Sequence, residues 1–494
     1  MWQDRFAHEW LWSSGNLSPL SILARVCSVN LTLRRFPTTE KENAVASHRT
    51  PKTMDDMPMP RHGIHWSVGS NIPDLTNRGV EYLMMGFAMK RGRKVLVAMS
   101  GGVDSSVAAA LLREQGHEVV GCFMRLGSDD SLNNDTVEQV TKQSTQESGQ
   151  EAGRPGRPHH QGCCSLNDAA DARLVAAILD IPLYVMNFRR DFDRIVDYFV
   201  DQYNAGRTPN PCIRCNTWLK FGKLAAYAKS IDADFVATGH YARVDHTNGD
   251  RPGRIRRGKD LNKDQSYVLF GTKRDMLDHM LLPIGSISKV KVRQLAKRWS
   301  LPVYNKPDSQ EICFVPDNDY FRLLKERTPN QIRTGRLVDQ DGNVLGEHHG
   351  HQRYTIGQRR GLSISLGYPI YVTEKDSITN TITVGRPESL LAEALVAGEA
   401  NWFIDPPTHT PIACEVKIRS HGPSVPATVH ATSSDTFKVQ FGQPQRAVSP
   451  GQAAVCYVGD HLIGGGWISE SSRLAPRDES HLAKRGDTYA PHAK

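Results

Sequence analysis

The chain has 494 residues, of which 39% are hydrophobic and 23% are charged, so we expect several domains of a soluble globular protein. No stretch approaches the roughly 20 apolar residues of a membrane-spanning helix, which argues against a membrane protein. The formal net charge of +8 suits a polyanionic partner such as RNA, although a mildly basic protein without such a partner fits it as well.

The first 89 residues mix Trp, Pro, Ser and His without a sustained period, and the first clear strand pattern begins at Lys94. Two interpretations stay open: a translation start assigned too early, which we favour, or a transit-like extension. Acidic residues accompany the arginines, so the transit signature is weak. We therefore expect a cytoplasmic protein, or a mitochondrial one if the extension is genuine.

From Lys94 on, strand-type and helix-type segments alternate, which predicts an α/β domain with a doubly wound parallel sheet over residues 90–315. The apolar run Lys94–Met99 is typical of a buried parallel strand. The other predicted strands are His117–Phe123, Leu183–Asn187 and Phe235–Thr238. The predicted helices are Ser105–Gln115, Asn167–Leu179, Phe192–Tyr203 and Leu219–Lys229. Residues 127–161 are polar and lack aromatic side chains, so we expect a flexible insertion there.

The pattern changes after about residue 315. A short mixed segment with Gly-rich turns and basic residues predicts a small central domain over 316–389. Short β-type runs separated by turn residues then predict an antiparallel β-barrel over 390–470. The clearest of these runs are Ala413–Ile418, Ala427–His430 and Thr436–Phe441. The polar residues 471–494 are expected to be a disordered tail.

The segment Ser100–Ser106, with the sequence Ser-Gly-Gly-Val-Asp-Ser-Ser, follows the first strand and opens the first helix. Its glycines let the backbone approach an anion, and the N–H groups at the helix start favour phosphate. Asp104 is a candidate ligand for Mg²⁺ against the phosphates. The segment is neither a Walker A loop nor a GxGxxG fingerprint. A plain glycine turn is the alternative, but the full string resembles the pyrophosphate loop of the ATP-pyrophosphatase superfamily, whose members split ATP into AMP and pyrophosphate.

Two cysteine-bearing segments decide between members of that superfamily. They are Gly206-Arg-Thr-Pro-Asn-Pro-Cys-Ile-Arg-Cys-Asn216 and Asp308-Ser-Gln-Glu-Ile-Cys-Phe314. With these strings, and with Ala237-Thr-Gly-His-Tyr241 and Thr355-Ile-Gly-Gln-Arg-Arg-Gly361, the chain resembles the tRNA 2-thiouridylases from about residue 92 to 468. An amine-transferring relative would need no such thiols, and a noncatalytic tRNA-binding protein would not need the intact loop.

The resemblance implies a tRNA 2-thiouridine synthase that depends on ATP and Mg²⁺. Such an enzyme adenylates O2 of the wobble uridine and transfers sulfur from a cysteine persulfide to C2, releasing AMP and pyrophosphate. By the resemblance, Cys313 is the persulfide intermediate and Cys215 the nucleophile, with the thiolate as the reactive form of each. The partners are tRNA and a sulfur donor or persulfide relay protein.

Cys212 departs from the part of the family that has Asp at this position. The thiolates of Cys212, Cys215 and Cys313 would alternatively hold a [4Fe–4S] cluster, so a persulfide relay and an iron–sulfur site both stay open. The remaining cysteines receive structural or peripheral roles. Buried positions are expected for Cys27, Cys122, Cys414 and Cys456, and a peripheral position for Cys163 and Cys164.

The resemblance also implies ligand contacts, position by position. The ATP contacts are Ala98, Met99, Ser100, Gly101, Gly102, Val103, Asp104, Ser105, Met124 and Gly239. The contacts with the flipped target base and the tRNA are Asn210, Pro211, Cys212, His240, Lys263, Asp264, Gln265, Arg359, Arg360 and Gln452. Without the resemblance, Met124 would be an ordinary core methionine and the Arg359–Arg360 pair a solvated surface.

Overall fold

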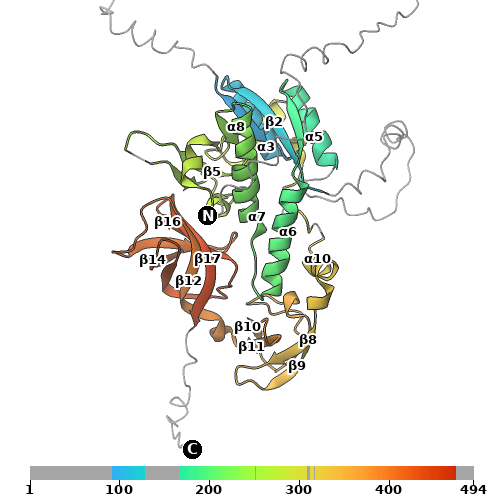
Figure 1. Ribbon diagram of the computed structural model, residues 1–494, viewed down its shortest axis with the longest axis vertical. Helices are drawn as coiled ribbons and strands as arrows, with labels where there is room; N and C mark the ends of the chain where they lie inside the picture. Colours follow the sequence, from blue (N-terminus) through green and yellow to red (C-terminus); the bar gives the residue numbers. More distant parts are fainter. Residues whose placement is uncertain (1–91, 128–165, 251, 309–311, 316, 474–494) are drawn as a thin grey trace, which may run out of the picture. The chain divides into compact units, whose positions relative to one another are not determined.

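The structure is a computed structural model that describes residues 92–127, 166–250, 252–308, 312–315 and 317–473 (Figure 1). The predictions for the N-terminal extension, for Cys27, Cys163 and Cys164, for nearly all of the 127–161 insertion and for most of the tail lie outside these residues. No helix within the described ranges is both long and apolar enough to cross a membrane.

The first domain is built on a parallel sheet of five strands in the order β3-β2-β1-β4-β7. The strands are β1 (Lys94–Ala98), β2 (Glu118–Arg125), β3 (Leu183–Asn187), β4 (Phe235–Ala237) and β7 (Met280–Leu281). Val95 and Val97 of β1 pack into one apolar core and Leu96 into a second. Because both faces of β1 are covered, its sequence is continuously apolar rather than alternating.

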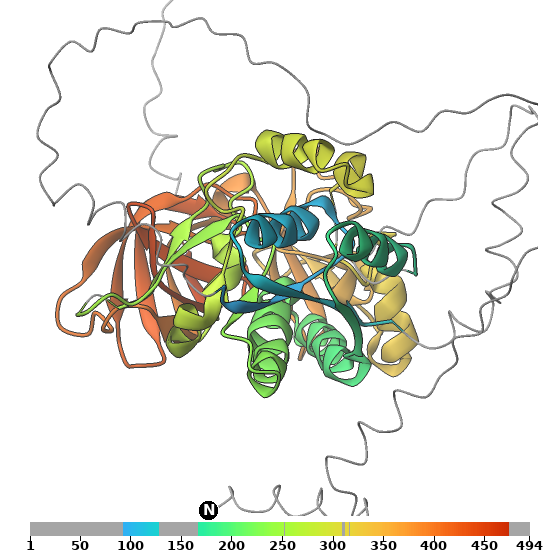
Figure 2. The ribbon, with the colours of Figure 1, turned by 90° about the horizontal axis from the view of Figure 1, so that it is seen from above.

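Helices cover both faces of this sheet, which confirms the predicted doubly wound α/β fold (Figure 2). On one face lie α3 (Val103–Glu114), α5 (Leu166–Ile178) and α9 (Lys289–Arg298). On the other lie α6 (Arg189–Asn204) and α8 (Leu224–Ser230).

The helix predicted over Leu219–Lys229 begins earlier than expected. It starts as α7 (Pro211–Arg214), continues as the π-helix η2 (Cys215–Lys223) and ends as α8. Pro211 suits a first helical position because proline lacks the N–H that would be unsatisfied there. π-helical turns are rare and concentrate at functional sites. Cys215 is the first residue of this π-helical stretch.

A second sheet forms the central domain and follows α10 (Tyr320–Arg327). Its four strands have the order β10-β11-β8-β9, with only β11 and β8 parallel. They are β8 (Thr334–Val338), β9 (Val344–His349), β10 (Tyr371–Asp376) and β11 (Thr381–Gly385). Leu337, Val372 and Ile382 are almost fully buried and form its core.

Lys375 of β10 is partly buried, and its Nζ atom is fully buried where the central sheet meets α6. Its Nζ atom lies 5.9 Å from the ring centroid of Tyr203 and has no hydrogen-bond partner among the described residues. Burial therefore lowers the pKa of Lys375 from 10.5 to about 7. Burial, followed by the nearby charge of Lys375, lowers the pKa of His351 to about 4. A titrating amine thus sits in this junction without a counterion that the structure describes.

The C-terminal sheet closes into a barrel, as predicted, because β12 pairs with both β15 and β17. Its strands are β12 (Leu391–Trp402), β13 (Ile412–Lys417), β14 (Val425–Ala431), β15 (Phe437–Arg446), β16 (Ala453–Val458) and β17 (His461–Arg473). The hairpin β5 (Ala242–Asp245) and β6 (Arg254–Arg257) also joins this sheet, since Ile255 pairs with Leu462 of β17. The sequence did not predict this addition.

Short 3-10 turns connect these elements at Ser266–Leu269, Arg274–His279, Pro302–Asn305, Pro329–Gln331, His351–Arg353 and Pro387–Leu390. Cys122 and Cys456 are fully buried, as predicted, and Cys414 is partly buried. A side-chain hydrogen bond with Cys414, together with burial, raises the pKa of the Cys456 thiol.

Candidate functional site

The segment Ser100–Gly102 joins β1 to α3 and leaves the start of the helix uncapped by a side chain. Gly102 is the N-cap residue with φ −96° and ψ 164°, and no side-chain cap is present. Ser105 and Ser106 instead hold the turn, because both hydroxyls donate to the Gly102 carbonyl oxygen, at 3.2 and 2.8 Å. The N–H groups at the start of α3 therefore remain suited to an anion.

Two glycines allow close packing around this loop. Gly101 has φ +70°, and a Cβ there would lie 2.8 Å from both the Cα and the carbonyl carbon of Asp168 and would clash with its carbonyl oxygen. Gly239 follows β4, and a Cβ there would lie 2.6 Å from both the Asp104 carbonyl carbon and the Ser105 nitrogen. The chain after β4 thus touches the start of α3, so a side chain at residue 239 would push the two apart.

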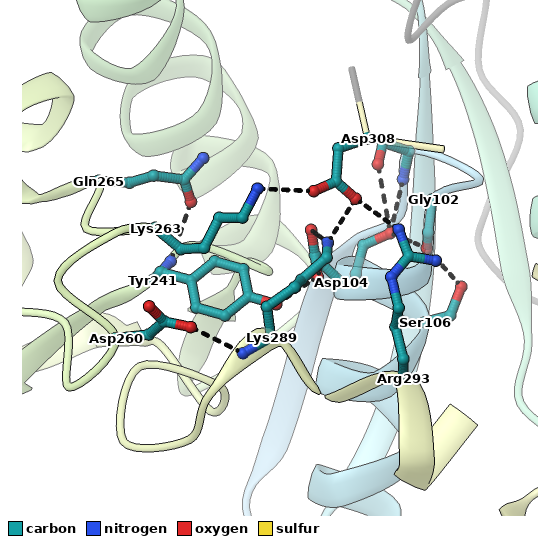
Figure 3. Close-up of polar contacts among 12 residues, drawn as sticks. Gly102, Asp104, Ser106, Tyr241, Asp260, Lys263, Gln265, Lys289, Arg293 and Asp308 are labelled. Atoms are coloured by element: carbon teal, nitrogen blue, oxygen red, sulfur yellow. Dashed lines mark hydrogen bonds and ion pairs between the residues drawn. The ribbon is translucent and has the colours of Figure 1, made fainter. Parts of the chain in front are cut away.

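The Asp104 carboxylate is held by two side chains at the mouth of the loop (Figure 3). Lys289 Nζ donates to both carboxylate oxygens at 2.8 Å, and the Tyr241 hydroxyl donates to Oδ1 at 2.6 Å. Lys289 is the first residue of α9 and is only 8% exposed. A cationic side chain from α9 therefore already neutralises Asp104. Mg²⁺ could bind this carboxylate only beside Lys289 or in its place.

Asp308 links the loop to the segment that bears Cys313. Its carboxylate accepts from Lys289 and Arg293 at 2.8 Å and from Lys263 at 2.9 Å (Figure 3). Burial alone would raise the pKa of Asp308, but the hydrogen bonds from Lys289 and Lys263 outweigh it and hold the value at about 2. Asp308 is therefore charged at neutral pH and pairs with cations from two separate segments.

Lys306 also anchors the same segment to the loop. Its Nζ donates to the Gly101 carbonyl oxygen at 3.0 Å and pairs with Asp168 and Asp171 of α5. Burial opposes the charge, but the hydrogen bonds to Asp168 and Asp171 raise the pKa of Lys306. Residues 306–308 are thus held directly against the loop Ser100–Gly102, called the phosphate-type loop below.

Cys215 and Cys313 are both partly buried and pack against the same apolar cluster. Phe314 fixes the neighbourhood of Cys313, because its ring packs edge-on against Phe192 and Phe199 of α6 at 5.6 and 5.1 Å. Cys212 lies on α7 and is exposed. No three His, Cys, Asp or Glu side chains among the described residues gather into a metal-ligand group. The three cysteines, all of them in the described part, therefore do not form a cluster site in this structure.

The expected base-binding segment is attached to the barrel. Asn210 is the N-cap residue of α7, and Gln452 Nε2 donates to the carbonyl oxygens of Thr208 and Pro209 at 3.0 and 3.3 Å. His240 is buried, with Nδ1 2.7 Å from the Thr238 hydroxyl. Burial and then the charge of Lys220 hold the pKa of His240 well below its usual range, so the ring is neutral.

The other expected contacts occupy varied positions. Gln265 accepts from the Tyr241 N–H at 2.9 Å, and Asp264 accepts from the Gly258 and Ser266 N–H groups, so both carry structural bonds. Ala98 and Met99 are buried beside the loop, and Met124 is partly buried in β2. Arg359 and Arg360 are exposed in the central domain.

Sequence reasoning missed Lys289, Arg293 and the role of Asp308 as their common acceptor. Lys289 stands in a lysine-rich helix start after Ser288, whose hydroxyl accepts from the Lys291 N–H. In the sequence it is indistinguishable from a surface lysine, since only its burial against Asp104 sets it apart. Tyr241 stood within a string used for the resemblance but received no role.

Three family models match the chain in order. The model described as "tRNA methyl transferase HUP domain" matches residues 93–317, "tRNA methyl transferase PRC-barrel domain" matches 322–386 and "Aminomethyltransferase beta-barrel domain" matches 392–468. A solved 4-thiouridine synthetase–RNA complex with bound ATP aligns with 48% of this chain and 51% of its own at 12% identity, with a TM-score of 0.29.

Curated relatives cover nearly the whole described part. The tRNA-specific 2-thiouridylase MnmA of Rhodopirellula baltica is 45% identical over 390 residues, which is 76% of this chain and 96% of the relative. The enzyme of the same name from Carboxydothermus hydrogenoformans is 46% identical over 381 residues, which is 76% of this chain and 98% of the relative. The chain therefore belongs to the tRNA-specific 2-thiouridylase MnmA family.

Proposed function

We propose that this protein is a tRNA-uridine 2-sulfurtransferase that uses ATP to replace O2 of a wobble uridine with sulfur. The observation that carries the proposal is the chain of ion pairs from Asp104 through Lys289 to Asp308 and Lys263. It joins a phosphate-type loop, the segment of Cys313 and an expected tRNA contact within one site. An enzyme that activates RNA with ATP and then delivers sulfur needs these three parts together.

ATP is proposed to bind with its phosphates at the start of α3, next to the backbone of Gly101–Ser105 and to the ion-paired lysines Lys289 and Lys306. The open helix start and the buried Lys289 support this placement. Mg²⁺ held near Asp104 would neutralise phosphate charge. Adenylation makes the uridine oxygen a leaving group, because it then departs as part of AMP.

The sulfur transfer is proposed to use a persulfide on Cys313. Its outer sulfur attacks C2 of the adenylated uridine and AMP departs, leaving the base joined to Cys313 through two sulfurs. The Cys215 thiolate then attacks the Cys313 sulfur, which frees the 2-thiouridine and leaves a Cys215–Cys313 disulfide for a dithiol reductant. Both cysteines pack against the same large apolar core, which supports placing the two thiols in one part of the molecule.

The target base is proposed to lie against Asn210, Pro211 and Cys212, with the neutral His240 close to it. The base must leave its stack for C2 to be reached. Lys263 and Gln452, with Arg359 and Arg360 of the central domain, are proposed to bind the tRNA around it. The bonds from Gln452 to Thr208 and Pro209 support a base-binding segment fixed by the barrel.

Incubation with ATP, tRNA and a persulfide donor, followed by nucleoside mass spectrometry, tests the function. We expect 2-thiouridine in place of uridine, with AMP and pyrophosphate formed in equal amounts. Cys313→Ser and Cys215→Ser should abolish the product, whereas Cys212→Ser should retain it in a persulfide relay. Full activity of either first variant overturns the relay. Loss of 2-thiouridine formation in all three variants, together with iron in the anaerobically purified protein, favours the [4Fe–4S] alternative.

We also propose the domain limits given above, with an ATP-binding domain over 90–315, a central domain over 316–389 and a barrel over 390–470. The limits of the three matching family models lie close to these residues. A cytoplasmic location remains our proposal, and fractionation of cells that express the full chain tests it.

A further inference from the structure

Two thiols lie together inside the C-terminal barrel and have no part in the chemistry described so far. Cys414 stands on β13 and Cys456 on β16, two antiparallel strands in which Val416 lies opposite Cys456. Side chains two residues apart on a strand share a face, so Cys414 and Cys456 are diagonal neighbours on one face of the sheet. Both pack in the apolar core of the barrel.

A hydrogen bond joins the two sulfur atoms and makes them chemically unequal. The Cys456 thiol donates to the Cys414 sulfur, and the Val429 N–H of β14 donates to the same sulfur. The bond from Cys456 lowers the pKa of Cys414 in spite of its burial, whereas this bond and burial together raise the pKa of Cys456. Because the thiolate is the form that attacks an oxidant, Cys414 is the more reactive of the two.

The exposure of the two side chains points in the same direction. Cys414 is partly buried and lies between two exposed residues of β13, whereas Cys456 is fully buried. A solute as small as a peroxide would therefore meet Cys414 first. Thiols that oxidise reversibly combine thiolate character and exposure with a second thiol within reach, and Cys414 has all three.

The strand register leaves room for a bond between these sulfurs to close. The β13–β16 ladder ends with the pair Glu415–Tyr457, so Cys414 lies one residue beyond it. The β16–β17 ladder shifts its register between Cys456 and Tyr457, and such irregularities bend a strand locally. Diagonal Cα atoms lie roughly 7–8 Å apart and a disulfide spans up to about 6.8 Å, so the backbone needs to close by only about 1 Å.

We propose that Cys414 and Cys456 form a reversible oxidation site, in which a peroxide oxidises Cys414 and Cys456 then closes a disulfide between β13 and β16. The site is separate from Cys215 and Cys313, and the inference does not depend on the proposed function. The bond would join two strands that β14 and β15 separate in the chain, so it would stabilise the barrel.

Atoms and electrons balance in two steps. The Cys414 thiolate attacks one oxygen of hydrogen peroxide, the O–O bond breaks and hydroxide leaves, so Cys414 becomes a sulfenic acid. The Cys456 sulfur then attacks the Cys414 sulfur, the S–O bond breaks, and the oxygen leaves as water with the Cys456 proton. In sum, two thiols lose two electrons to one peroxide, which becomes two waters.

The test exposes the folded full-length protein to a small excess of hydrogen peroxide and then blocks the remaining thiols with iodoacetamide. Mass spectrometry of the digest, without reduction, maps the linked peptides. We expect the Cys414 peptide joined to the Cys456 peptide, and dithiothreitol should release the two. Cys122 is the matched control, because it is equally buried and burial raises its pKa to about 12, so it should stay a thiol.

Two variants separate the steps. Cys456→Ala should stop at the sulfenic acid on Cys414, which dimedone captures, and Cys414→Ser should leave Cys456 unoxidised. Oxidation should raise the melting temperature of the wild type by at least about 3 °C and should not raise that of Cys414→Ser. Because Cys414→Ser keeps Cys215 and Cys313, it controls for oxidation at those thiols.

Three results overturn the inference. The first is an unmodified Cys414 in the wild type at a peroxide dose that oxidises the exposed Cys212. The second is a Cys414 that proceeds to sulfinic acid without the linked peptides. The third is an equal change of melting temperature in the wild type and in Cys414→Ser.

Discussion

Replacing Lys375 with methionine should stabilise the protein in a pH-dependent manner. Methionine has a similar length and no charge, so it fills the same space beside Tyr203. The pKa of Lys375 falls from 10.5 to about 7, and each pH unit corresponds to about 1.4 kcal/mol. The buried amine therefore costs the fold up to about 5 kcal/mol at pH 7 and below.

The sign follows from proton binding. Between about pH 7 and 10.5 the unfolded chain holds the Lys375 proton and the folded chain does not, so stability rises with pH across this window. In Lys375→Met the free energy of unfolding should not rise across this window. It should exceed that of the wild type most at the low-pH end. Urea unfolding at several pH values measures the free energy of unfolding, with the exposed Lys438→Met as control. Parallel pH profiles for wild type and Lys375→Met would refute an unpaired buried amine.

Three further outcomes are expected. Gly239→Ala should destabilise the protein by about 1–3 kcal/mol and raise the KM for ATP, because its Cβ would lie 2.6 Å from the backbone of residues 104 and 105; an unchanged melting temperature and KM would contradict this packing. Asp308→Asn should lower stability by about 2 kcal/mol at neutral pH, and the difference from wild type in urea unfolding should vanish as the pH falls from 3.8 to about 2, where the carboxylate protonates. Iodoacetamide should label the exposed Cys212 in the folded protein but not the buried Cys122 or Cys456, which peptide mass spectrometry checks; labelling of Cys122 at the rate of Cys212 would be inconsistent with the core.

The sequence predicted the parallel sheet and the loop after β1 because both follow from local pattern. A continuously apolar run such as Val95–Met99 is typical of a strand covered on both faces, and the glycines Gly101 and Gly102 follow it after one serine. The site around the loop was only partly predictable. Lys289 and Asp308 meet through tertiary packing, and no local period distinguishes a buried lysine from a solvated one.

Two other features of the structure were not predicted from the sequence, for related reasons. The π-helical turn at Cys215 has the same composition as an α-helix, because the two differ in hydrogen-bond register and not in residue type. The hairpin β5–β6 was absorbed into the first domain, since its four-residue strands carry arginines and resemble a surface loop. Its partner strand is set by a distant pairing that periodicity does not encode.

That distant pairing has a consequence for biosynthesis. Ile255 of β6 meets Leu462 of β17, so about 200 residues must emerge from the ribosome before the hairpin gains its neighbour. Until then a nascent chain presents a bare strand edge, together with the Tyr267 hydroxyl that later bonds to the Ala453 backbone. A message truncated ahead of the barrel should consequently yield material prone to aggregation and degradation, not a smaller working enzyme.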